Sequence, residues 1–577
     1  MADSQGIHVD PPQPHGRGRQ LAQAGLVIVL LLAAGLAVAA FLDPFGWHLV
    51  DRMRGRYDAA LAAVPADSSF YVGVNLLNVD QNRLGEIRTA LDAATAGTTA
   101  DFGDARRNLD EMLTQQLGLS LEQDILPWLG QYIGLAVLRV EPDEDGRLAA
   151  PDWVLSVETR DRDAADRFLE KLRSGWADFT GTAPAGDEYQ GVTITYFDTA
   201  PAEARIAFAR SKGLVLFGSG PRALRAAIEA QRGNSLADTG AFSELMPELP
   251  RGRLLTAFVN GSQLDQIAAV LPEAVPESVA ANAPTAAIRG IALSLSLTDA
   301  GVQIDGVTAY DEARLSDAQR RALETYVAGT ETAVLYPAET YLFLAGRGIN
   351  LIWDYYHERV AAEMGESDFK ESMSLFARQF GINPDTELFP FLDGDAAVGV
   401  MRVAGGKSVF PGAAGLGATA VIGSSDPDTL AAHIAAFSDS IGDPVTGLGT
   451  VEKNAPGNDL VTYHFESVLF PAVPLNYGVG RGYLLLGSSQ EALSELWPPA
   501  GESLADGEGF RQATEALPEG MAPGLYLDVA GLLAFLGQET ALEPAVTPFR
   551  AISTIAAGGR ADGNLARFTV LVNIPAN

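Results

Sequence analysis

Two short patterns place reactive side chains at spacings that known catalytic sites use. His357-Glu358 begins like the zinc-binding helix of metalloproteases, but the second histidine of that helix would stand four residues after the first, where the chain has Ala361. Ser367 and Lys370 have the Ser-x-x-Lys spacing that puts a nucleophile and its base on one helical turn in penicillin-recognising enzymes, whose partner motifs do not occur in this sequence. Each pattern lacks a residue that its chemistry requires, so we predict no catalytic residues.

A glycine-rich segment, Gly405-Gly406-Lys407-Ser408, resembles the end of a phosphate-binding loop. Such a loop opens with an earlier glycine, which would fall at Met401, and leads into a helix, where this chain has Pro411. The Gly-x-Ser-x-Gly pattern of α/β-hydrolases does not occur. We therefore predict neither phosphate binding nor a hydrolase of that class.

Clusters of carboxylates could bind calcium in turns. Asp393 and Asp395 flank Gly394, and a second cluster precedes Gly146. The members of the second cluster are Glu141, Asp143, Glu144 and Asp145. Neither cluster has the EF-hand spacing with its distal glutamate, so we interpret both as solvated acidic turns and predict no metal and no cofactor.

Composition excludes several further classes of function. The chain has 577 residues, of which 47% are apolar, enough for the cores of roughly two to four domains. It has no cysteine, and only His48, His357, His433 and His464 follow the first 42 residues, which is a small supply for metal or acid–base chemistry. A formal net charge of −33 repels phosphate backbones, so we predict no nucleic-acid partner.

One segment near the amino end could cross a membrane. Residues 25–42 carry no charge, and counted from residue 21 the stretch reaches about the 20 residues that span a bilayer. The anchor residues are Leu21, Gly25, Leu26, Val27, Ile28, Val29, Leu30, Leu31, Leu32, Leu36, Val38 and Phe41. The alternatives are a cleaved signal peptide, for which Ala37 and Ala39 have the required small side chains, and a buried core helix. We predict a retained transmembrane anchor over residues 21–42.

The segments on either side of the anchor bear on its orientation. Residues 1–20 are polar and contain three prolines, so we predict a disordered cytoplasmic tail. Basic residues flank the anchor on both sides and do not decide the orientation, but long domains translocate largely regardless of charge. We therefore expect a single-pass protein of the cell membrane with most of its acidic chain outside the cytoplasm, in a periplasmic or extracellular location.

Matching segments recur in the same order in the two halves of the chain. Residues 117–140 match residues 380–403, and residues 235–260 match residues 503–528. The offset between matched segments changes little along the chain, as short loop insertions would produce. Self-similarity of this kind predicts an internal duplication.

The segment between the two halves has the signals of a helix. Ser316 and Gln319 have the spacing of a capping box, and Ala318 and Leu323 lie on one apolar stripe. We therefore predict a helical connector over residues 311–330.

Within each half, short β-branched or aromatic runs bounded by Gly, Pro or Asp alternate with helical patterns. Near the end of each half, turns at residues 299–301 and 562–564 predict hairpins, and adjacent strands joined by short turns are antiparallel. We predict an α+β fold: two tandem copies of a mostly antiparallel sheet with helices packed on one face, preceded by one amino-terminal transmembrane helix. The copies are assigned to residues 60–310 and 331–577.

The order of several segments in the first half resembles that of a bacterial family of proteins of unknown function, of the DUF3352 type. The segments are PADSSFYVGVNL, PWLGQYIGLAVL, LVLFGSGPRALRAAIEA and SLADTGAFSELMPELPRGRLLTAFVN. The resemblance is best over residues 62–260 and weaker in the second half. Members of this family look like single-span envelope proteins and offer no catalytic residues to carry over, so the resemblance implies location and fold class.

Three classes of function remain open. The first is a membrane-anchored envelope protein that is not an enzyme and binds a protein or an envelope polymer, which is favoured because no polar constellation suited to catalysis is found. The alternative is a carrier of an apolar ligand such as a lipid, because helices over a sheet can leave a cavity. An envelope hydrolase that depends on carboxylates is the least favoured. The sequence indicates neither the identity of the partner nor the oligomeric state.

Overall fold

The computed structural model describes most of the chain from residue 59 onwards. The described ranges are 59–76, 81–94, 102–138, 152–198, 205–264, 285–324, 330–403, 415–445, 447–457, 460–468, 475–496, 501–536 and 547–575. The predicted membrane anchor, residues 21–42, lies outside these ranges. Among the helices inside them, none combines the length and the apolar character needed to cross a bilayer.

The chain divides into two compact units, each with an antiparallel sheet and helices. Unit 1 comprises Met1–Gln81, Ala100–Ser243 and Leu254–Pro276, and unit 2 comprises Asn82–Thr99, Glu244–Arg253 and Glu277–Asn577. The division does not fall between the two halves of the sequence, because the hairpin at the end of the first half belongs to unit 2. The predicted α+β class with mostly antiparallel strands is confirmed.

Unit 1 has one antiparallel sheet, whose strands lie in the order β8-β1-β2-β3-β7-β6-β5-β4. The strands are β1 (Phe70–Asn75), β2 (Leu129–Val137), β3 (Trp153–Thr159), β4 (Ala185–Tyr189), β5 (Val192–Phe197), β6 (Ile206–Ser211), β7 (Leu214–Gly218) and β8 (Leu255–Asn260). The helical elements are η1 (Ala59–Ala63), α3 (Phe102–Leu117), η3 (Leu121–Ile125), α4 (Arg162–Thr180), α5 (Pro221–Ala230), η5 (Leu236–Asp238), most of α6 (Gly240–Leu245) and η7 (Gly261–Gln263).

Helices cover both faces of the unit 1 sheet, not one face as the sequence predicted. Phe208 of β6 packs in a cluster with Phe168 of α4, whereas its neighbour Ala207 packs in another cluster with Leu224 of α5. Every residue of β7 is buried. A strand that is buried on both faces usually has a continuous apolar sequence. The sequence of β7, LVLFG, has this pattern, so cover on both faces of the sheet could have been predicted from it.

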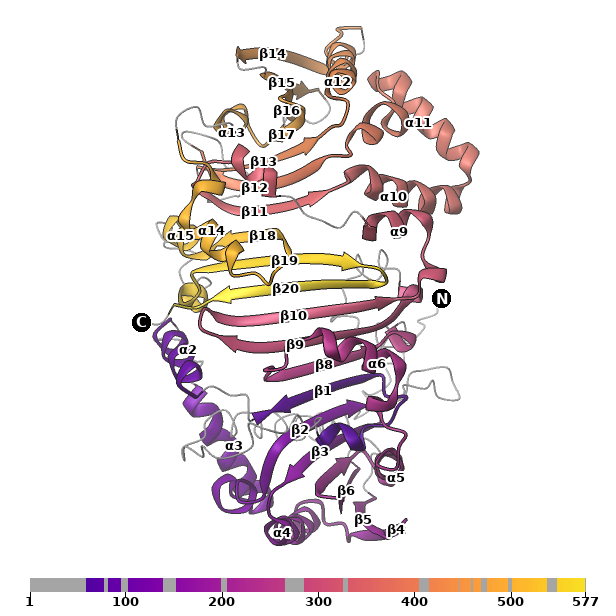
Figure 1. The fold of residues 1–577 in the computed structure, drawn as a ribbon, viewed down its shortest axis with the longest axis vertical. Coiled ribbons are helices and arrows are strands. Elements are labelled where there is room, and N and C mark those ends of the chain that lie inside the picture. Colours follow the sequence, from indigo (N-terminus) through magenta and orange to yellow (C-terminus); the bar gives the residue numbers. More distant parts are fainter. Residues whose placement is uncertain are drawn as a thin grey trace, which may run out of the picture. The chain divides into compact units, whose positions relative to one another are not determined.

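Unit 2 has a larger antiparallel sheet, in the order β9-β10-β20-β19-β18-β11-β12-β13-β17-β16-β15-β14. The strands are β9 (Ile288–Thr298), β10 (Gly301–Tyr310), β11 (Thr340–Arg347), β12 (Asp395–Arg402), β13 (Leu416–Gly423), β14 (Gly449–Gly457), β15 (Leu460–Ser467), β16 (Leu475–Gly480), β17 (Tyr483–Gly487), β18 (Ala522–Asp528), β19 (Thr554–Asp562) and β20 (Leu565–Asn573). The last strand, β20, lies between β10 and β19 (Figure 1).

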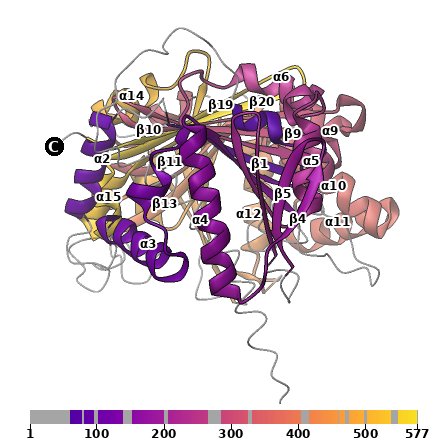
Figure 2. The same cartoon turned by 90° about the horizontal axis from the view of Figure 1, so that it is seen from below.

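The helices of unit 2 also lie on both faces of its sheet. They include α2 (Gln81–Ala94, apart from its first residue), α9 (Asp317–Glu324), η10 (Thr330–Leu335), α10 (Ile349–Met364), α11 (Glu366–Phe380), η11 (Pro384–Leu388), η12 (Phe389–Phe391), α12 (Pro427–Ile441), α13 (Gln490–Glu495), η13 (Leu504–Asp506), α14 (Glu508–Glu515), α15 (Val529–Leu536) and η14 (Thr547–Ala551). Residues of α13 and α14 pack with Leu485 of β17, and residues of α12 pack with Leu484. Figure 2 shows α14 and α12 on opposite sides of the strands of unit 2.

The helical signal between the two halves of the sequence corresponds to α9. The backbone N–H of Gln319 donates to Ser316 Oγ at 3.2 Å, and the backbone N–H of Ser316 donates to Gln319 Oε1 at 3.0 Å. This reciprocal pair is the capping box that the sequence indicated, and it satisfies two backbone donors that the first turn of a helix leaves open.

Candidate functional site

His357, on α10, is held between two carboxylates. Its Nδ1 atom lies 3.1 Å from Asp385 Oδ1, and its Nε2 atom lies 3.5 Å from Glu366 Oε2. The imidazole ring stacks on Phe369, with 4.3 Å between ring centroids. The indole N–H of Trp353 also donates to Asp385 Oδ1, at 3.0 Å. These contacts join α10 to α11 and η11.

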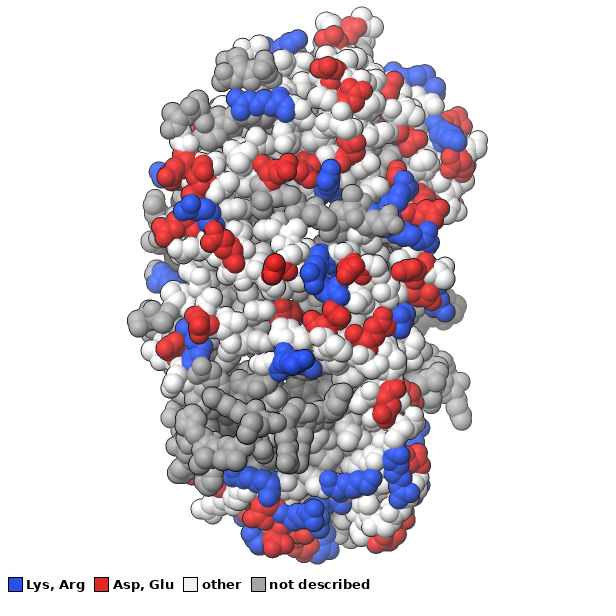
Figure 3. All heavy atoms as spheres, in the orientation of Figure 1, with Lys and Arg blue, Asp and Glu red and all other residues white. Residues whose placement is uncertain are grey.

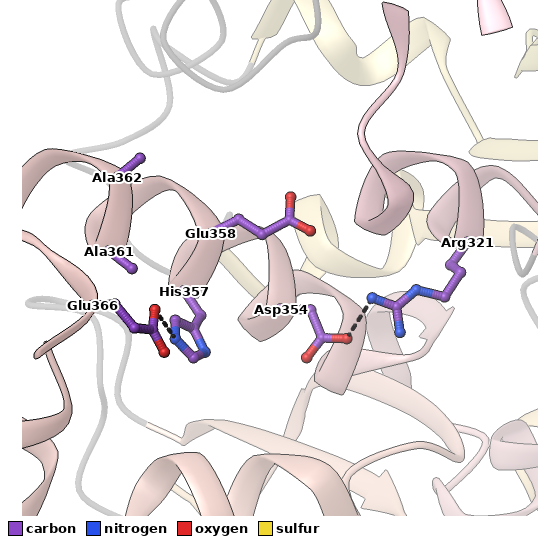
Figure 4. Close-up of a pocket in the computed structure, with 7 residues that line it drawn as sticks. All are labelled: Arg321, Asp354, His357, Glu358, Ala361, Ala362 and Glu366. Carbon is purple, nitrogen blue, oxygen red and sulfur yellow. Dashed lines mark ion pairs between the residues drawn. The ribbon is translucent and has the colours of Figure 1, made fainter. Parts of the chain in front are cut away.

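The same histidine lines an open hollow of about 490 Å³ on unit 2. In Figure 4, Glu366 points toward His357, and Asp354 points toward Arg321, to which it is paired at 3.1 Å. The remaining lining residues are Glu358, Ala361 and Ala362. Within the described ranges, no group of three or more His, Cys, Asp or Glu side chains could hold a metal ion. The hollow therefore contains charged pairs that support the helices, and the described residues around it offer no set of metal ligands.

The Ser-x-x-Lys pattern on α11 is not arranged as a catalytic pair. Lys370 Nζ lies 2.9 Å from Glu366 Oε1, one turn before it on the same helix. The hydrogen bond from Lys370 lowers the pKa of the Glu366 carboxyl below its usual value. Ser367 is exposed in the first turn of α11. Lys370 therefore stabilises a carboxylate of its own helix, and the pattern has a structural explanation.

The other motifs have structural explanations or cannot be placed. Asp393 accepts hydrogen bonds from the backbone N–H and the hydroxyl of Ser425, at 2.8 and 2.6 Å. His464 on β15 is bonded through Nδ1 to Asn476 Oδ1 on the neighbouring strand, at 2.7 Å. The glycine-rich segment 405–408 and the acidic cluster 141–145 lie outside the described residues.

A large apolar surface lies on the face of the unit 2 sheet opposite to α13 and α14. Leu485 faces those helices, so Leu486 points to the opposite face, because successive residues of a strand alternate. From Leu486 the strand register leads across nine adjacent strands on that same face, one residue in each. This first row is Leu295, Ile304, Val570, Ala557, Leu525, Leu344, Val398, Ala420 and Leu486.

A second row runs parallel to the first, two residues further along each strand. It crosses eight strands and consists of Leu297, Val302, Val572, Ile555, Leu527, Leu342, Val400 and Ala418. We call these two rows, nine residues and eight residues, the apolar face. Every one of the seventeen side chains is apolar.

The apolar face is partly exposed. None of its residues falls in the buried class, and Leu344, Val398 and Leu486 are 39%, 43% and 36% exposed. On the other face of β9, by contrast, Ser294 and Ser296 are only 1% and 7% exposed, and their hydroxyls have no hydrogen-bond partner. Polar groups normally face water and leucines face the core. This inverted distribution, over a contiguous surface, makes the apolar face the candidate binding site.

Helices bound the apolar face at two of its edges. Ile87 of α2 packs on Leu297, Val302 and Val572 at one corner. At the far edge, the strand next to Leu486 carries Tyr477, which is covered by α12 and shares a hydrogen bond of 2.8 Å with the hydroxyl of Ser438. In Figure 1, α2 and α15 lie at one end of the central strands of unit 2, and α9 and α10 lie at the other.

Charge is distributed differently on the face of the molecule drawn in Figure 3, where Asp and Glu side chains are interspersed with Lys and Arg. Such a mixed surface is the ordinary state of a protein in water. The two rows of the apolar face contain neither sign of charge. An anionic or cationic group would therefore find no partner within these rows, whereas a hydrocarbon would.

Sequence reasoning did not identify the apolar face. In β9 the alternation of Ile291, Leu293, Leu295 and Leu297 with small residues shows that one face is apolar. It does not show whether that face is covered. The register of nine strands, taken from distant parts of the chain, was needed to bring these residues together.

These features define a class of protein: an α+β protein with extended antiparallel sheets and a partly exposed apolar sheet face. The chain belongs to the family described as "Protein of unknown function (DUF3352)", whose model matches residues 24–574. The family resemblance indicated by the sequence is thereby confirmed.

Comparisons with other proteins add little. Two solved structures of TP0453, crystal forms I and III, are 10% and 9% identical to this chain, with TM-scores of 0.24 and 0.23. Each comparison covers 48% of this chain, and 89% and 90% of the respective TP0453 chains. TM-scores this low support no argument about function. No curated protein matches the chain.

Proposed function

We propose that this protein is a non-enzymatic binding protein of the cell envelope whose apolar face carries an apolar ligand such as a lipid. The observation that supports this function is the apolar face itself: seventeen apolar side chains, none of them buried, in two unbroken rows. The carrier hypothesis is therefore preferred to a scaffold for a protein or an envelope polymer.

The chemistry of the apolar face favours hydrocarbon over a protein partner. A typical protein–protein interface includes about ten direct hydrogen bonds and a polar rim. The seventeen side chains offer no hydrogen-bonding group, and the strands behind them pair with each other. An apolar ligand needs only contact and exclusion of water, which such a surface supplies.

A non-enzymatic role is supported by the polar sites. Asp385 and Glu366 are paired with the His357 ring, and Glu366 is also paired with Lys370. Neither motif has a nucleophile and base within hydrogen-bond reach, which acyl transfer requires.

The membrane anchor over residues 21–42 is part of the proposal, and it rests on the sequence. An anchor would hold the carrier beside a source of lipid. Protease added to intact spheroplasts is expected to degrade the chain beyond residue 42. Survival of the chain until the membrane is lysed would contradict a location outside the cytoplasm.

An internal duplication is also part of the proposal. It is supported by equivalent strand pairings in the two halves of the chain. β1 pairs with β2 and β8, as β11 pairs with β12 and β18, and β3 pairs with β7 as β13 pairs with β17. An isolated bridge joins Pro65 to Ser235, and another joins Pro337 to Ser503. Both serines begin the same Ser-Leu-Ala-Asp capping box. Two copies of one ancestral unit account for these matches.

The test is ligand binding by the full chain. We expect lipid to copurify with the protein from its own membrane, detected by mass spectrometry, and the delipidated protein to bind the apolar dye N-phenyl-1-naphthylamine. Leu344→Asp and Val398→Asp are expected to abolish dye binding because each places a charge in the first row. Val445→Asp is the matched control, since Val445 is 91% exposed elsewhere on unit 2.

Three outcomes would overturn the proposal. The first is a protein without copurified lipid that does not bind the dye. The second is dye binding that both charged variants retain. The third is a dimer in sedimentation analysis that dissociates in Leu344→Asp, because the apolar face would then be an interface between two copies of the chain.

A further inference from the structure

Part of the first row of the apolar face has a counterpart on the sheet of unit 1. Strands β11, β12, β13 and β17 of unit 2 are adjacent in the same order as β1, β2, β3 and β7 of unit 1. Directly opposed residues of neighbouring strands share one face of a sheet. In unit 2 the register joins Leu344, Val398, Ala420 and Leu486. In unit 1 the register joins Val72, Leu135, Leu155 and Phe217.

Local features at one end of each row support this correspondence. Phe217 of β7 and Leu486 of β17 each stand directly before the glycine that ends the strand. On the helices that pack on the same face, Phe168 of α4 and His433 of α12 stand at the same position after an aspartate N-cap. The two rows can therefore be compared position by position.

In unit 1 this row is part of a hydrophobic core. Leu155 and Phe217 are only 2% and 5% exposed, and Leu135 packs against the same cluster. The cluster also contains Phe168 of α4, whose ring centroid lies 6.3 Å from that of Phe217, and Leu113 of α3. Helices therefore cover this part of the unit 1 sheet.

In unit 2 the corresponding side chains are smaller and more exposed. Val398, Ala420 and Leu486 stand where unit 1 has Leu, Leu and Phe. Val398 and Leu486 are more than one third exposed, and Ala420 is partly exposed. On the helix, a partly exposed histidine, His433, stands where unit 1 has a buried phenylalanine. Unit 2 therefore has less hydrocarbon of its own at the place where unit 1 has a filled core.

We infer that the hydrocarbon of the ligand binds against Val398, Ala420 and Leu486, at the place that larger side chains fill in unit 1. This inference rests on the proposed function and locates its ligand on the apolar face. We call these three residues, together with Leu344, the seat. The seat crosses four strands, which is about 14 Å, so a compact apolar molecule or a single hydrocarbon chain covers it.

The opposite end of the apolar face is less suited to a ligand. Ile87, Ala551 and Ile574 form a buried cluster that packs on second-row residues of β9, β10 and β20. A ligand there would compete with side chains of the protein itself. At the seat, a ligand covers leucine and valine side chains that are exposed to water, so its binding gains more from the burial of apolar surface.

The first experiment enlarges side chains at the seat. Ala420→Leu/Leu486→Phe introduces the side chains that unit 1 has at these positions. The matched control, Leu295→Phe/Ala557→Leu, makes the same two changes in the first row on β9 and β19. Binding of N-phenyl-1-naphthylamine to the delipidated full chain is measured by dye fluorescence. We expect the seat variant to weaken binding at least tenfold, because the added side chains occupy the place of the ligand, and the control to stay within twofold.

The second experiment does not depend on how a larger side chain is accommodated. Because the chain has no cysteine, Leu486→Cys and Leu295→Cys each provide a single thiol. Each full-chain variant is labelled with a maleimide, with and without saturating dioctanoyl phosphatidylcholine below its critical micelle concentration. We expect the lipid to slow labelling of Leu486→Cys at least fivefold and labelling of Leu295→Cys less than twofold.

The possible failures are distinguishable. Dye binding that the seat variant retains, or that the control weakens equally, would overturn the seat and leave the carrier function standing. Protection of Leu486→Cys that is no stronger than that of Leu295→Cys would do the same. Absence of dye binding and of lipid protection in every form of the chain would overturn the proposed function itself.

Discussion

Substitution of Gly399 by alanine tests the packing on the face of the unit 2 sheet that α13 and α14 cover. Gly399 lies on β12 under the ring of Tyr336, which is fully buried. A methyl group at Gly399 would stand 2.2 Å from Cε1 and 2.6 Å from Cδ1 of that ring. The ring cannot move away freely, because its hydroxyl donates to the carbonyl of Ala397 at 3.1 Å and its edge packs on Phe343 at 5.4 Å.

The expected cost of Gly399→Ala has two parts. Overpacking of a filled core costs about 1–3 kcal/mol. Displacing Tyr336 also breaks its buried hydrogen bond, which contributes about 1 kcal/mol. We therefore expect a loss of about 2–4 kcal/mol in the free energy of unfolding. For a unit of this size that corresponds to a fall in melting temperature of roughly 3–6 °C.

The assay is differential scanning calorimetry of the full chain with a matched glycine. Gly346, on the adjacent strand β11, has nothing within 4 Å of its missing side chain, so Gly346→Ala is expected to stay within about 0.5 kcal/mol of wild type. In the double variant Tyr336→Leu/Gly399→Ala the clash is removed, and the loss should be smaller than the sum of the two single losses. A melting temperature of Gly399→Ala within 1 °C of wild type, or strict additivity, would refute this account of the packing.

Three further predictions concern stability. Burial raises the pKa of Tyr477 to about 12, above the value near 10 of an unfolded chain. The contribution of its neutral phenol to the free energy of unfolding is therefore present below pH 10 and lost between pH 10 and 12. Tyr477→Phe should flatten the fall in melting temperature over that window. Hydrogen bonds from the hydroxyl and the backbone N–H of Ser503, in the capping box that begins η13, lower the pKa of Asp506. The contribution of the Asp506 carboxylate to the free energy of unfolding is therefore present at neutral pH and lost as pH falls below the usual aspartate range. Asp506→Asn should lower the melting temperature at pH 7 more than at pH 3. The guanidinium of Arg83 donates to the carbonyls of Thr298 and Ile574 at 2.9 and 2.8 Å; Arg83→Leu should cost about 2–3 kcal/mol and increase hydrogen exchange in α2, and unchanged exchange there would contradict this role.

Much of the local structure could be predicted from the sequence, because turns and caps are local signals. The hairpin of β9 and β10 turns at residues 299–300, and that of β19 and β20 turns at Gly563, whose φ of 56° suits glycine. Ser316 and Gln319 begin α9 as the capping box indicated. In each case two to four neighbouring residues determine the outcome.

The arrangement of layers could not be predicted in the same way. Alternation in β9 separates leucines from serines but does not say which side a helix covers, and the structure buries the serines. The apolar face depends on register between strands hundreds of residues apart, such as Leu295 and Leu525. The candidate site was missed for the same reason. Its side chains are of the types that usually form a hydrophobic core, and only their exposure in the folded chain distinguishes them.

The position of β20 has a consequence for biogenesis. Val302 of β10 pairs with Val572, so this strand pair closes only after the whole intervening chain has been synthesised. Until β20 enters, β10 and β19 each expose an unpaired edge and the rows of the apolar face are interrupted. Pairings between such distant residues form slowly, and exposed edges invite aggregation. Insertion of β20 therefore completes both the sheet and the rows of the apolar face, so a lipid bound to those rows, as proposed above, would favour the finished fold over its aggregation-prone precursor.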